Sequence, residues 1–254
     1  MTRQSPARAP DHSDDLTRRA FAEALGTALL VLAVVGSGIA ASQLSAGDTG
    51  LALLENAVAT AGALVALIYT LGPVSGAHMN PVVTIADRAL GGISMRAACG
   101  YVAAQFVGGS VGAVVANVIF SRPAVTLSTT VRTGGALWTS EVVATFGLLL
   151  VIFGLVRSRR KAAVPLSVAA YIGGAYFFTS STSFANPAVT IARTLSDTFS
   201  GISPGSAPSF LAAQLLGAAL AVVTVRYLYP TDRGAREPES DFSATQSSPE
   251  PAMA

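Results

Sequence analysis

The stretch NPVVTIA at residues 80–86 returns as NPAVTIA at residues 186–192, identical at six of its seven positions. Chance hardly explains such a match within one chain. Two further pairs of polar residues recur at a similar separation, namely Glu23 with Glu141 and Gln105 with Gln214. The chain is therefore an internal duplication, and its fold has to accommodate two equivalent halves.

Six other stretches are long and apolar enough to cross a membrane as helices, since a core of roughly 30 Å takes about 20 apolar residues. The composition agrees, because only 12% of the residues are charged, whereas a soluble domain carries about 25%. A soluble protein with a buried helical core would need polar helices around that core, and the sequence offers none. The six predicted spans lie at about 21–42, 51–71, 97–120, 137–156, 164–182 and 208–229.

Each half contains three spans, so the second half enters the membrane from the opposite side, as in the inverted repeats of channels and transporters. Each Asn-Pro stretch lies between the second and third spans of its half, and must leave and return on one side. About ten helical residues reach roughly 15 Å, half the hydrocarbon thickness. The sequence therefore predicts an all-α membrane protein with six transmembrane helices and two re-entrant half-helices that meet near the bilayer centre.

The residue types at both stretches favour a helix that begins there. Asn80 and Asn186 suit the N-cap, and Pro81 and Pro187 suit the first helical position. Each helix N-terminus carries about half a positive charge, and irregular backbone at this depth survives only inside protein or along a cavity. The stretches thus point to a pore, whereas two ordinary turns in surface loops would leave the repeat unexplained.

Charges near the spans predict the topology. The connection RSRRK at 157–161 carries four positive charges, while the connection after the first span carries Asp48 and no basic residue. Basic loops stay cytoplasmic, so both tails are expected in the cytoplasm, with the protein in the plasma (inner) membrane. The predicted organisation is an N-terminal tail at 1–19, a channel domain at 20–229 with repeats at about 20–120 and 137–229, and a disordered tail at 230–254.

Several functional classes are excluded by what the sequence lacks. A net charge of +2 is too small to indicate nucleic-acid binding, and the single Cys99 excludes an internal disulfide framework. His78 and His12 are far apart, so they predict no metal site. No cluster of catalytic residues is present either. We therefore expect neither an enzyme nor a cofactor, and a partner set of membrane lipid and small neutral solutes.

The stretches SGAHMNP at 75–81 and SFANPA at 183–188 resemble the paired signatures of the aquaporin/glycerol-facilitator (major intrinsic protein) family. The resemblance runs from about residue 20 to 229 and includes AEALGT at 22–27. It implies a homotetramer of passive channels. It also implies pore-centre caps at Asn80, Pro81, Val82, Asn186, Pro187 and Ala188, and support of the re-entrant loops by Glu23, Glu141 and His78.

Some of these residues have other interpretations. Val82 replaces the alanine of the first signature, and the effect of its extra methyl groups on the width of the pore is open. Glu23 and Glu141 could instead be helix-end carboxylates that reach the membrane interface. His78 could be only a packed loop residue.

The same resemblance implies a selectivity filter of four positions, one of them usually an arginine three residues after the second Asn. Here that position is Val189, and the companion positions fall at Thr60, Gly174 and Ser183. These residues predict a wide, uncharged filter. Arg193 follows Val189 by four residues on the same helix face, and either adds charge at the outer mouth or extends to the extracellular interface.

The run TSSTSFANPA at 179–188 and the filter valine resemble a bacterial, arsenic-resistance-linked subgroup of metalloid channels. Arsenous acid is therefore preferred to glycerol as the expected solute. A water-selective pore is the alternative. A proton-coupled transporter would need carboxylates in the spans, and Glu23 and Glu141 are the only candidates. A structural membrane protein would conduct nothing.

Overall fold

The computed structural model describes residues 12–230, and all regular structure within that range is helical. Residues 1–11 and all but the first residue of the predicted tail at 230–254 lie outside the described part. The helices are α1 (His12–Leu44), α2 (Thr49–Ser75), α3 (Pro81–Ala89), α4 (Met95–Ile119), α5 (Gly135–Arg157), α6 (Val164–Phe178), α7 (Pro187–Ala192) and α8 (Ala207–Leu228), with 3-10 turns η1 (Lys161–Ala163) and η2 (Arg193–Leu195).

Six helical segments are long and apolar enough to cross a membrane, where α6 counts together with the 3-10 turn η1 as Lys161–Phe178, and this confirms the predicted spans and the predicted fold class. Several boundaries differ from the prediction, and α2 continues to Ser75 instead of 71. Helix α1 begins at His12, so residues 12–19 of the predicted tail are helical. Helix α6 ends at Phe178 instead of 182, because the backbone becomes extended at Thr179 and the Ser181 hydroxyl donates to Glu141.

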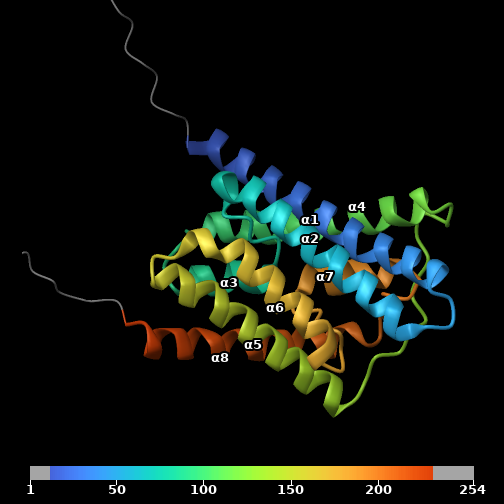
Figure 1. Cartoon of the computed structure of the whole chain (residues 1–254). Coiled ribbons are helices and arrows are strands. Elements are labelled where there is room, and N and C mark those ends of the chain that lie inside the picture. The colour runs from blue at the N-terminus through green and yellow to red at the C-terminus, as the bar shows by residue number, and fades with distance from the viewer. Residues whose placement is uncertain (1–11, 231–254) are drawn as a thin grey trace, which may run out of the picture.

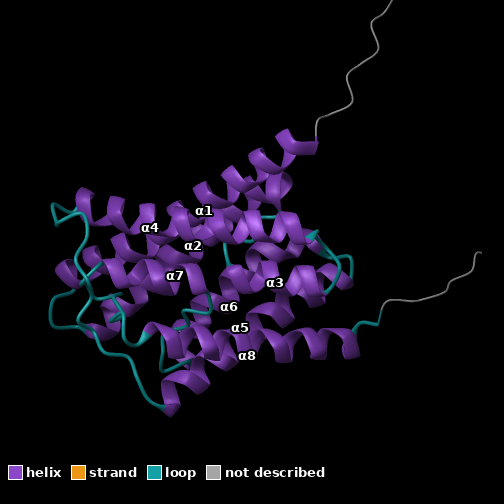
Figure 2. Ribbon diagram, turned by 180° about the vertical axis from the view of Figure 1, so that it is seen from behind, coloured by secondary structure: helices purple, strands orange, loops and turns teal. Residues whose placement is uncertain are grey.

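The long helices form two groups of three. Helix α1 packs against α2 and α4, and α5 packs against α6 and α8, so each group corresponds to one sequence repeat. Contacts between α2 and α6 join the groups. Both ends of the described chain lie at the same end of the bundle (Figure 1). The longest connections gather at the opposite end (Figure 2).

The two short helices α3 and α7 lie inside this bundle, one toward each end (Figure 1). Each packs against the last long helix of both groups, since α3 contacts α4 and α8, and α7 contacts α8 and α4. Helix α3 has nine residues, which at about 1.5 Å per residue is close to half a bilayer. The half-helices therefore complete one shared interior.

Glycines allow the closest helix contacts in each group. A Cβ atom at Gly108 of α4 would clash with the backbone of Ala24 in α1, and one at Gly217 of α8 would clash with the carbonyl of Val142 in α5. Small residues at such crossings let helices approach in lipid, where dispersion contacts stabilise the pair. The two clashes fall at equivalent positions of the repeat, so both groups are packed in the same way.

Replacing Gly108 with alanine is expected to destabilise the protein by about 1–3 kcal/mol, because α1 and α4 must move apart. The matched control is Gly62→Ala in α2, where an added Cβ meets nothing within 4 Å. The melting temperature of the detergent-solubilised protein checks this difference. Equal melting temperatures for the two variants would show that the α1–α4 contact is not tight.

Candidate functional site

The two half-helices begin at equivalent asparagine caps. The Asn80 Oδ1 atom accepts a hydrogen bond from the backbone N–H of Val82 at 3.0 Å. The Asn186 Oδ1 atom accepts from Ala188 at 3.0 Å and from Val189 at 3.3 Å. Each proline occupies the first turn, where its missing N–H removes a donor that would otherwise lack a partner.

The amide nitrogens of the caps join the two halves. The Asn80 Nδ2 atom donates to the carbonyl of Ala185 at 2.8 Å, and the Asn186 Nδ2 atom donates to the carbonyl of Met79 at 2.8 Å. Both asparagines also line the large internal cavity. Since an amide NH2 has two hydrogens, each cap retains one donor for a molecule in the cavity.

A buried carboxylate holds the loop before each cap. The Glu23 Oε1 atom accepts from the Ser75 hydroxyl at 2.6 Å and the His78 N–H at 2.9 Å. Its Oε2 atom accepts from the Met79 N–H at 2.6 Å and the Gln105 side chain at 2.8 Å. Glu23 has no exposed surface, so this carboxylate does not reach a membrane interface.

Glu141 repeats this arrangement in the second half. Its Oε1 atom accepts from the Ser181 hydroxyl at 2.6 Å and the Phe184 N–H at 2.9 Å. Its Oε2 atom accepts from the Ala185 N–H at 2.9 Å and the Gln214 side chain at 2.6 Å. The two carboxylates thus accept equivalent sets of four hydrogen bonds in the two halves.

The loops need this support because their backbone is strained. Ala77 and Met79 in the first loop, and Ser183 and Ala185 in the second, have φ angles between 47° and 54°. Such left-handed conformations cost of order 1–3 kcal/mol each in residues other than glycine. The hydrogen bonds to the carboxylates offset part of that cost and fix the loops beside the cavity.

A third carboxylate lies in a span and was missed by the sequence analysis. Glu55 lies in α2, where its Oε1 atom accepts from the Ser45 hydroxyl at 2.8 Å. The statement that Glu23 and Glu141 are the only candidates was therefore wrong. Glu55 does not line the cavity, however, and the oxygens of the other two carboxylates each accept two hydrogen bonds.

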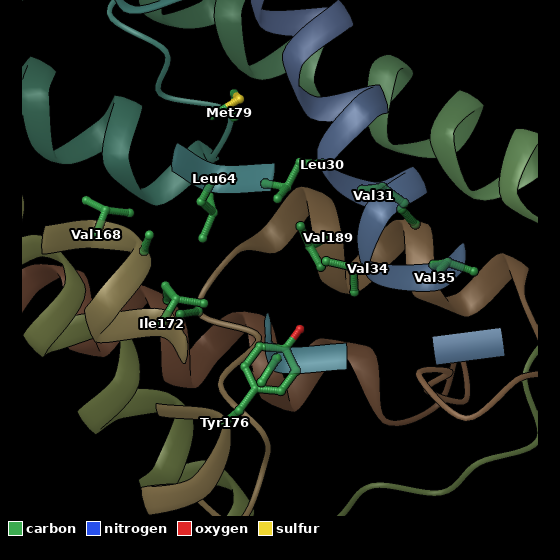
Figure 3. Close-up of a cluster of buried hydrophobic side chains, with 14 of the residues drawn as sticks. Leu30, Val31, Val34, Val35, Leu64, Met79, Val168, Ile172, Tyr176 and Val189 are labelled. Atoms are coloured by element: carbon green, nitrogen blue, oxygen red, sulfur yellow. The ribbon is translucent and has the colours of Figure 1, made fainter. Parts of the chain in front are cut away.

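The internal cavity has a volume of about 670 Å³ and extends between the two ends of the bundle, from Asp87 and Lys161 to Arg193. One wall is apolar and includes Leu30, Val34, Leu64, Val168 and Ile172. Polar groups of the two loops and caps line the rest. Figure 3 shows the apolar side chains from several helices grouped around this region. An amphipathic cavity suits a small uncharged polar molecule.

Three of the four predicted filter residues, Thr60, Ser183 and Val189, line this cavity. Gly174 does not, because it is exposed on the outer face of α6, so this part of the prediction is wrong. Tyr176 lines the cavity instead, and its hydroxyl lies 3.0 Å from that of Thr60. Figure 3 shows the Tyr176 hydroxyl directed toward Val34 and Val189.

Tyr176 is absent from the predicted filter because a count of residues from the caps does not include the direction of each side chain on α6. Two residues along a helix differ by about 200° in direction, so Gly174 and Tyr176 face opposite sides. The buried residues Val168, Ile172 and Tyr176 follow the four-residue spacing of one helix face. That spacing is a signal in the sequence that could have identified Tyr176.

Val82 does not narrow the cavity. Its backbone N–H takes part in the first cap, but its side chain has no exposed surface and packs in a cluster with Leu149 and Ala221. The extra methyl groups therefore fill the core between α3, α5 and α8. Pro81, Pro187 and Ala188 are buried as well, and none of them lines the cavity.

His78 combines a loop position with a place on the cavity wall. Its backbone N–H donates to Glu23, its Nδ1 atom lies 3.1 Å from the Thr84 hydroxyl, and its Nε2 atom lies 3.6 Å from Asp87. The ring also contacts Tyr101 edge-on at 5.4 Å between centroids. Among the described residues, no group of three or more metal-binding side chains is found.

Arg193 is buried at 3% exposure and lines the cavity. The interpretation that it extends to the extracellular interface is therefore wrong. Its Nε atom donates to the carbonyl of Ser200, and its guanidinium carbon lies 3.4 Å from the centroid of the Phe184 ring. A positive charge is thus present near the filter, one helical turn beyond Val189.

Replacing Glu141 with glutamine is expected to lower the free energy of unfolding by about 1–3 kcal/mol or more, because the new amide NH2 faces donors and leaves them unpaired. The control is Glu55→Gln, which keeps an acceptor for Ser45 outside the cavity. Melting temperatures and solute flux of both variants in liposomes check the expectation. A Glu141 variant as stable and active as the Glu55 variant would contradict it.

Comparisons with known proteins agree with this geometry. The sequence pattern of the family described as Major intrinsic protein matches residues 11–185. The aquaglyceroporin AqpS of Rhizobium meliloti (strain 1021) is 51% identical over 214 residues, which cover 84% of this chain and 91% of AqpS. Aquaporin AqpM of Methanothermobacter marburgensis is 31% identical over 84% of this chain and 98% of its own length.

A solved structure resembles the fold. The aquaglyceroporin from Plasmodium falciparum superposes with a TM-score of 0.60 and covers 84% of this chain and 95% of its own. At 22% sequence identity, this likeness concerns the arrangement of the helices alone.

Proposed function

The chain belongs to the major intrinsic protein family, whose members are channels for water and small solutes and not enzymes, and we propose that it passes small uncharged polyhydroxy solutes, arsenous acid ahead of glycerol. The single observation that carries this proposal is the composition of the filter. Val189 stands beside the hydroxyl groups of Thr60, Tyr176 and Ser183 on the cavity wall. This set offers hydrogen bonds and an apolar surface together.

The state of these hydroxyls supports the proposal. The Thr60 and Tyr176 hydroxyls bond to each other, while the buried Ser183 Oγ atom has no partner among the described residues. A buried polar atom without a partner is costly, so a permeating hydroxyl would stabilise it. The second hydrogens of Asn80 and Asn186 provide donors further along the path. Glycerol and arsenous acid each carry three hydroxyl groups that can use these sites.

The preference for arsenous acid rests on the resemblance of residues 179–188 to metalloid channels. Similarity to AqpS, which is named an aquaglyceroporin, supports a polyol-sized solute. It does not decide between arsenous acid and glycerol. A strictly water-selective pore is less well supported, because Val189 stands at the position where the family usually has an arginine.

Coupled transport is disfavoured by the saturated carboxylates. Each oxygen of Glu23 and Glu141 already accepts two hydrogen bonds from side chains and backbone. A proton or sodium ion bound there would displace contacts that hold the loops. Both carboxylates are thus committed to structure, as a passive channel requires.

We also propose a homotetramer in the plasma (inner) membrane, with one pore per subunit, a channel domain at about 20–229 and both termini in the cytoplasm. The basic connection at 157–161 favours this orientation. Exposed apolar side chains along the long helices, such as Phe177, Leu216 and Val223, offer surface for lipid and neighbouring subunits.

Replacing Val189 with arginine is expected to slow the influx of glycerol and arsenous acid about tenfold, which corresponds to about 1.4 kcal/mol of added barrier. The reason is that a long charged side chain would fill the space beside Ser183. Stopped-flow volume changes of liposomes that contain the purified protein measure this effect, with Val189→Leu as a control for bulk without charge.

The native protein provides the decisive comparison in the same assay. Rapid influx of either polyhydroxy solute supports the proposed filter. Rapid water flow with both solutes excluded would contradict it and would identify a water-selective channel.

A further inference from the structure

We propose that Arg193 is a specificity-determining residue at the outer end of the pore, where its guanidinium binds the hydroxyl oxygens of an incoming solute and repels cations. This inference rests on the proposed function as a channel for uncharged solutes. Arg193 lies seven residues after Asn186 and would supply the positive charge that Val189 lacks.

The helix geometry brings this residue to the filter. Val189 and Arg193 are four residues apart, so they share one face of the segment formed by α7 and η2. Both line the cavity together with Ser183 and Tyr176. The guanidinium therefore lies on the same path as the four filter side chains, one turn farther from the caps.

Two contacts hold the side chain in place. The Nε atom donates to the carbonyl of Ser200, and the planar group stacks on the Phe184 ring at 3.4 Å. That ring contacts Phe210 edge-on at 5.1 Å, while the Phe184 N–H donates to Glu141. The carboxylate that supports the loop thus also fixes the surface on which Arg193 lies.

The two terminal nitrogens remain available. Within residues 12–230, no hydrogen-bond acceptor for Nη1 or Nη2 and no carboxylate within ion-pair distance of Arg193 is found. A buried, unpaired charge is costly, and an apolar side chain would fill this space at lower cost. Because Arg193 lines the cavity, its free N–H groups can donate to a solute there.

The first repeat places the opposite charge at the opposite end. Asp87 lies seven residues after Asn80, as Arg193 does after Asn186, and it also lines the cavity. The inverted repeat therefore places Arg193 at the outer end of the path and Asp87 at the inner end, where Lys161 also lines the cavity. A cation that approaches from outside meets Arg193 before it reaches the caps, so rejection begins at the mouth.

The test compares Arg193→Gln, Arg193→Met and Arg193→Lys in liposomes, with Arg132→Gln as the control. Arg132 also lies near Phe184, at 5.4 Å, but it donates to the carbonyls of Gly201 and Phe199 and does not line the cavity. Two readouts are taken on each variant. One is the influx of glycerol and arsenous acid, and the other is the permeability to potassium and methylammonium.

The neutral variants are expected to raise cation permeability about tenfold or more, because a fixed charge in a weakly screened path has been removed. The lysine and Arg132 variants should remain as impermeable to cations as the native protein. The melting temperature shows whether the glutamine variant folds. If it does not, the methionine variant takes its place, because methionine keeps an unbranched apolar stem over Phe184.

Folded neutral variants that stay impermeable to cations would overturn the role of Arg193 and leave the proposed function intact. If the native protein excludes both polyhydroxy solutes, the proposed function fails instead, while the cation readout still reports on Arg193. A neutral variant that admits cations while the lysine variant excludes them supports the proposal.

Discussion

Two helix N-termini face each other inside this protein, and everything else in the fold depends on holding them there. Neither end is stable in that position alone, because each carries partial positive charge and follows a strained loop. Two buried carboxylates, Glu23 and Glu141, stabilise the loops, and the asparagine caps join the halves through Met79 and Ala185. The close helix contacts at Gly108 and Gly217 then enclose these polar groups in an apolar shell.

The repeat made the fold predictable from the sequence. A local motif of seven residues occurs twice, and an odd number of spans between its copies leaves only an inverted arrangement. The side chains around the pore were less predictable. Gly174 was predicted in the filter, whereas Tyr176 lines the cavity, because the direction of a side chain depends on helix phase. The environment of Arg193 depends on Ser200 and Phe184, which the loop fold brings to it. Val82 faces the core, which its motif position alone does not reveal.

The site combines a symmetric centre with asymmetric ends. Near the caps, the amide contact that each asparagine makes to the opposite half has a counterpart in the other half, so the middle of the path presents similar donors from both directions. Toward the ends the repeat has diverged, with Asp87 at one mouth and Arg193 at the other. Under the proposed function, selection among solutes depends on the divergent residues, while the shared residues maintain the structure. This division explains why the motif predicts the architecture better than the solute.

The hydrogen bonds from each asparagine cap to the opposite half also determine when the path can form during biosynthesis. A chain released only as far as α4 would contain Asn80 and its half-helix, but the carbonyl of Ala185 that receives the Asn80 amide would not yet have been made. The wall formed by α5 and α6 would be missing too. The first half alone therefore cannot enclose a conducting path. A membrane that receives the nascent protein stays sealed until the last spans are inserted.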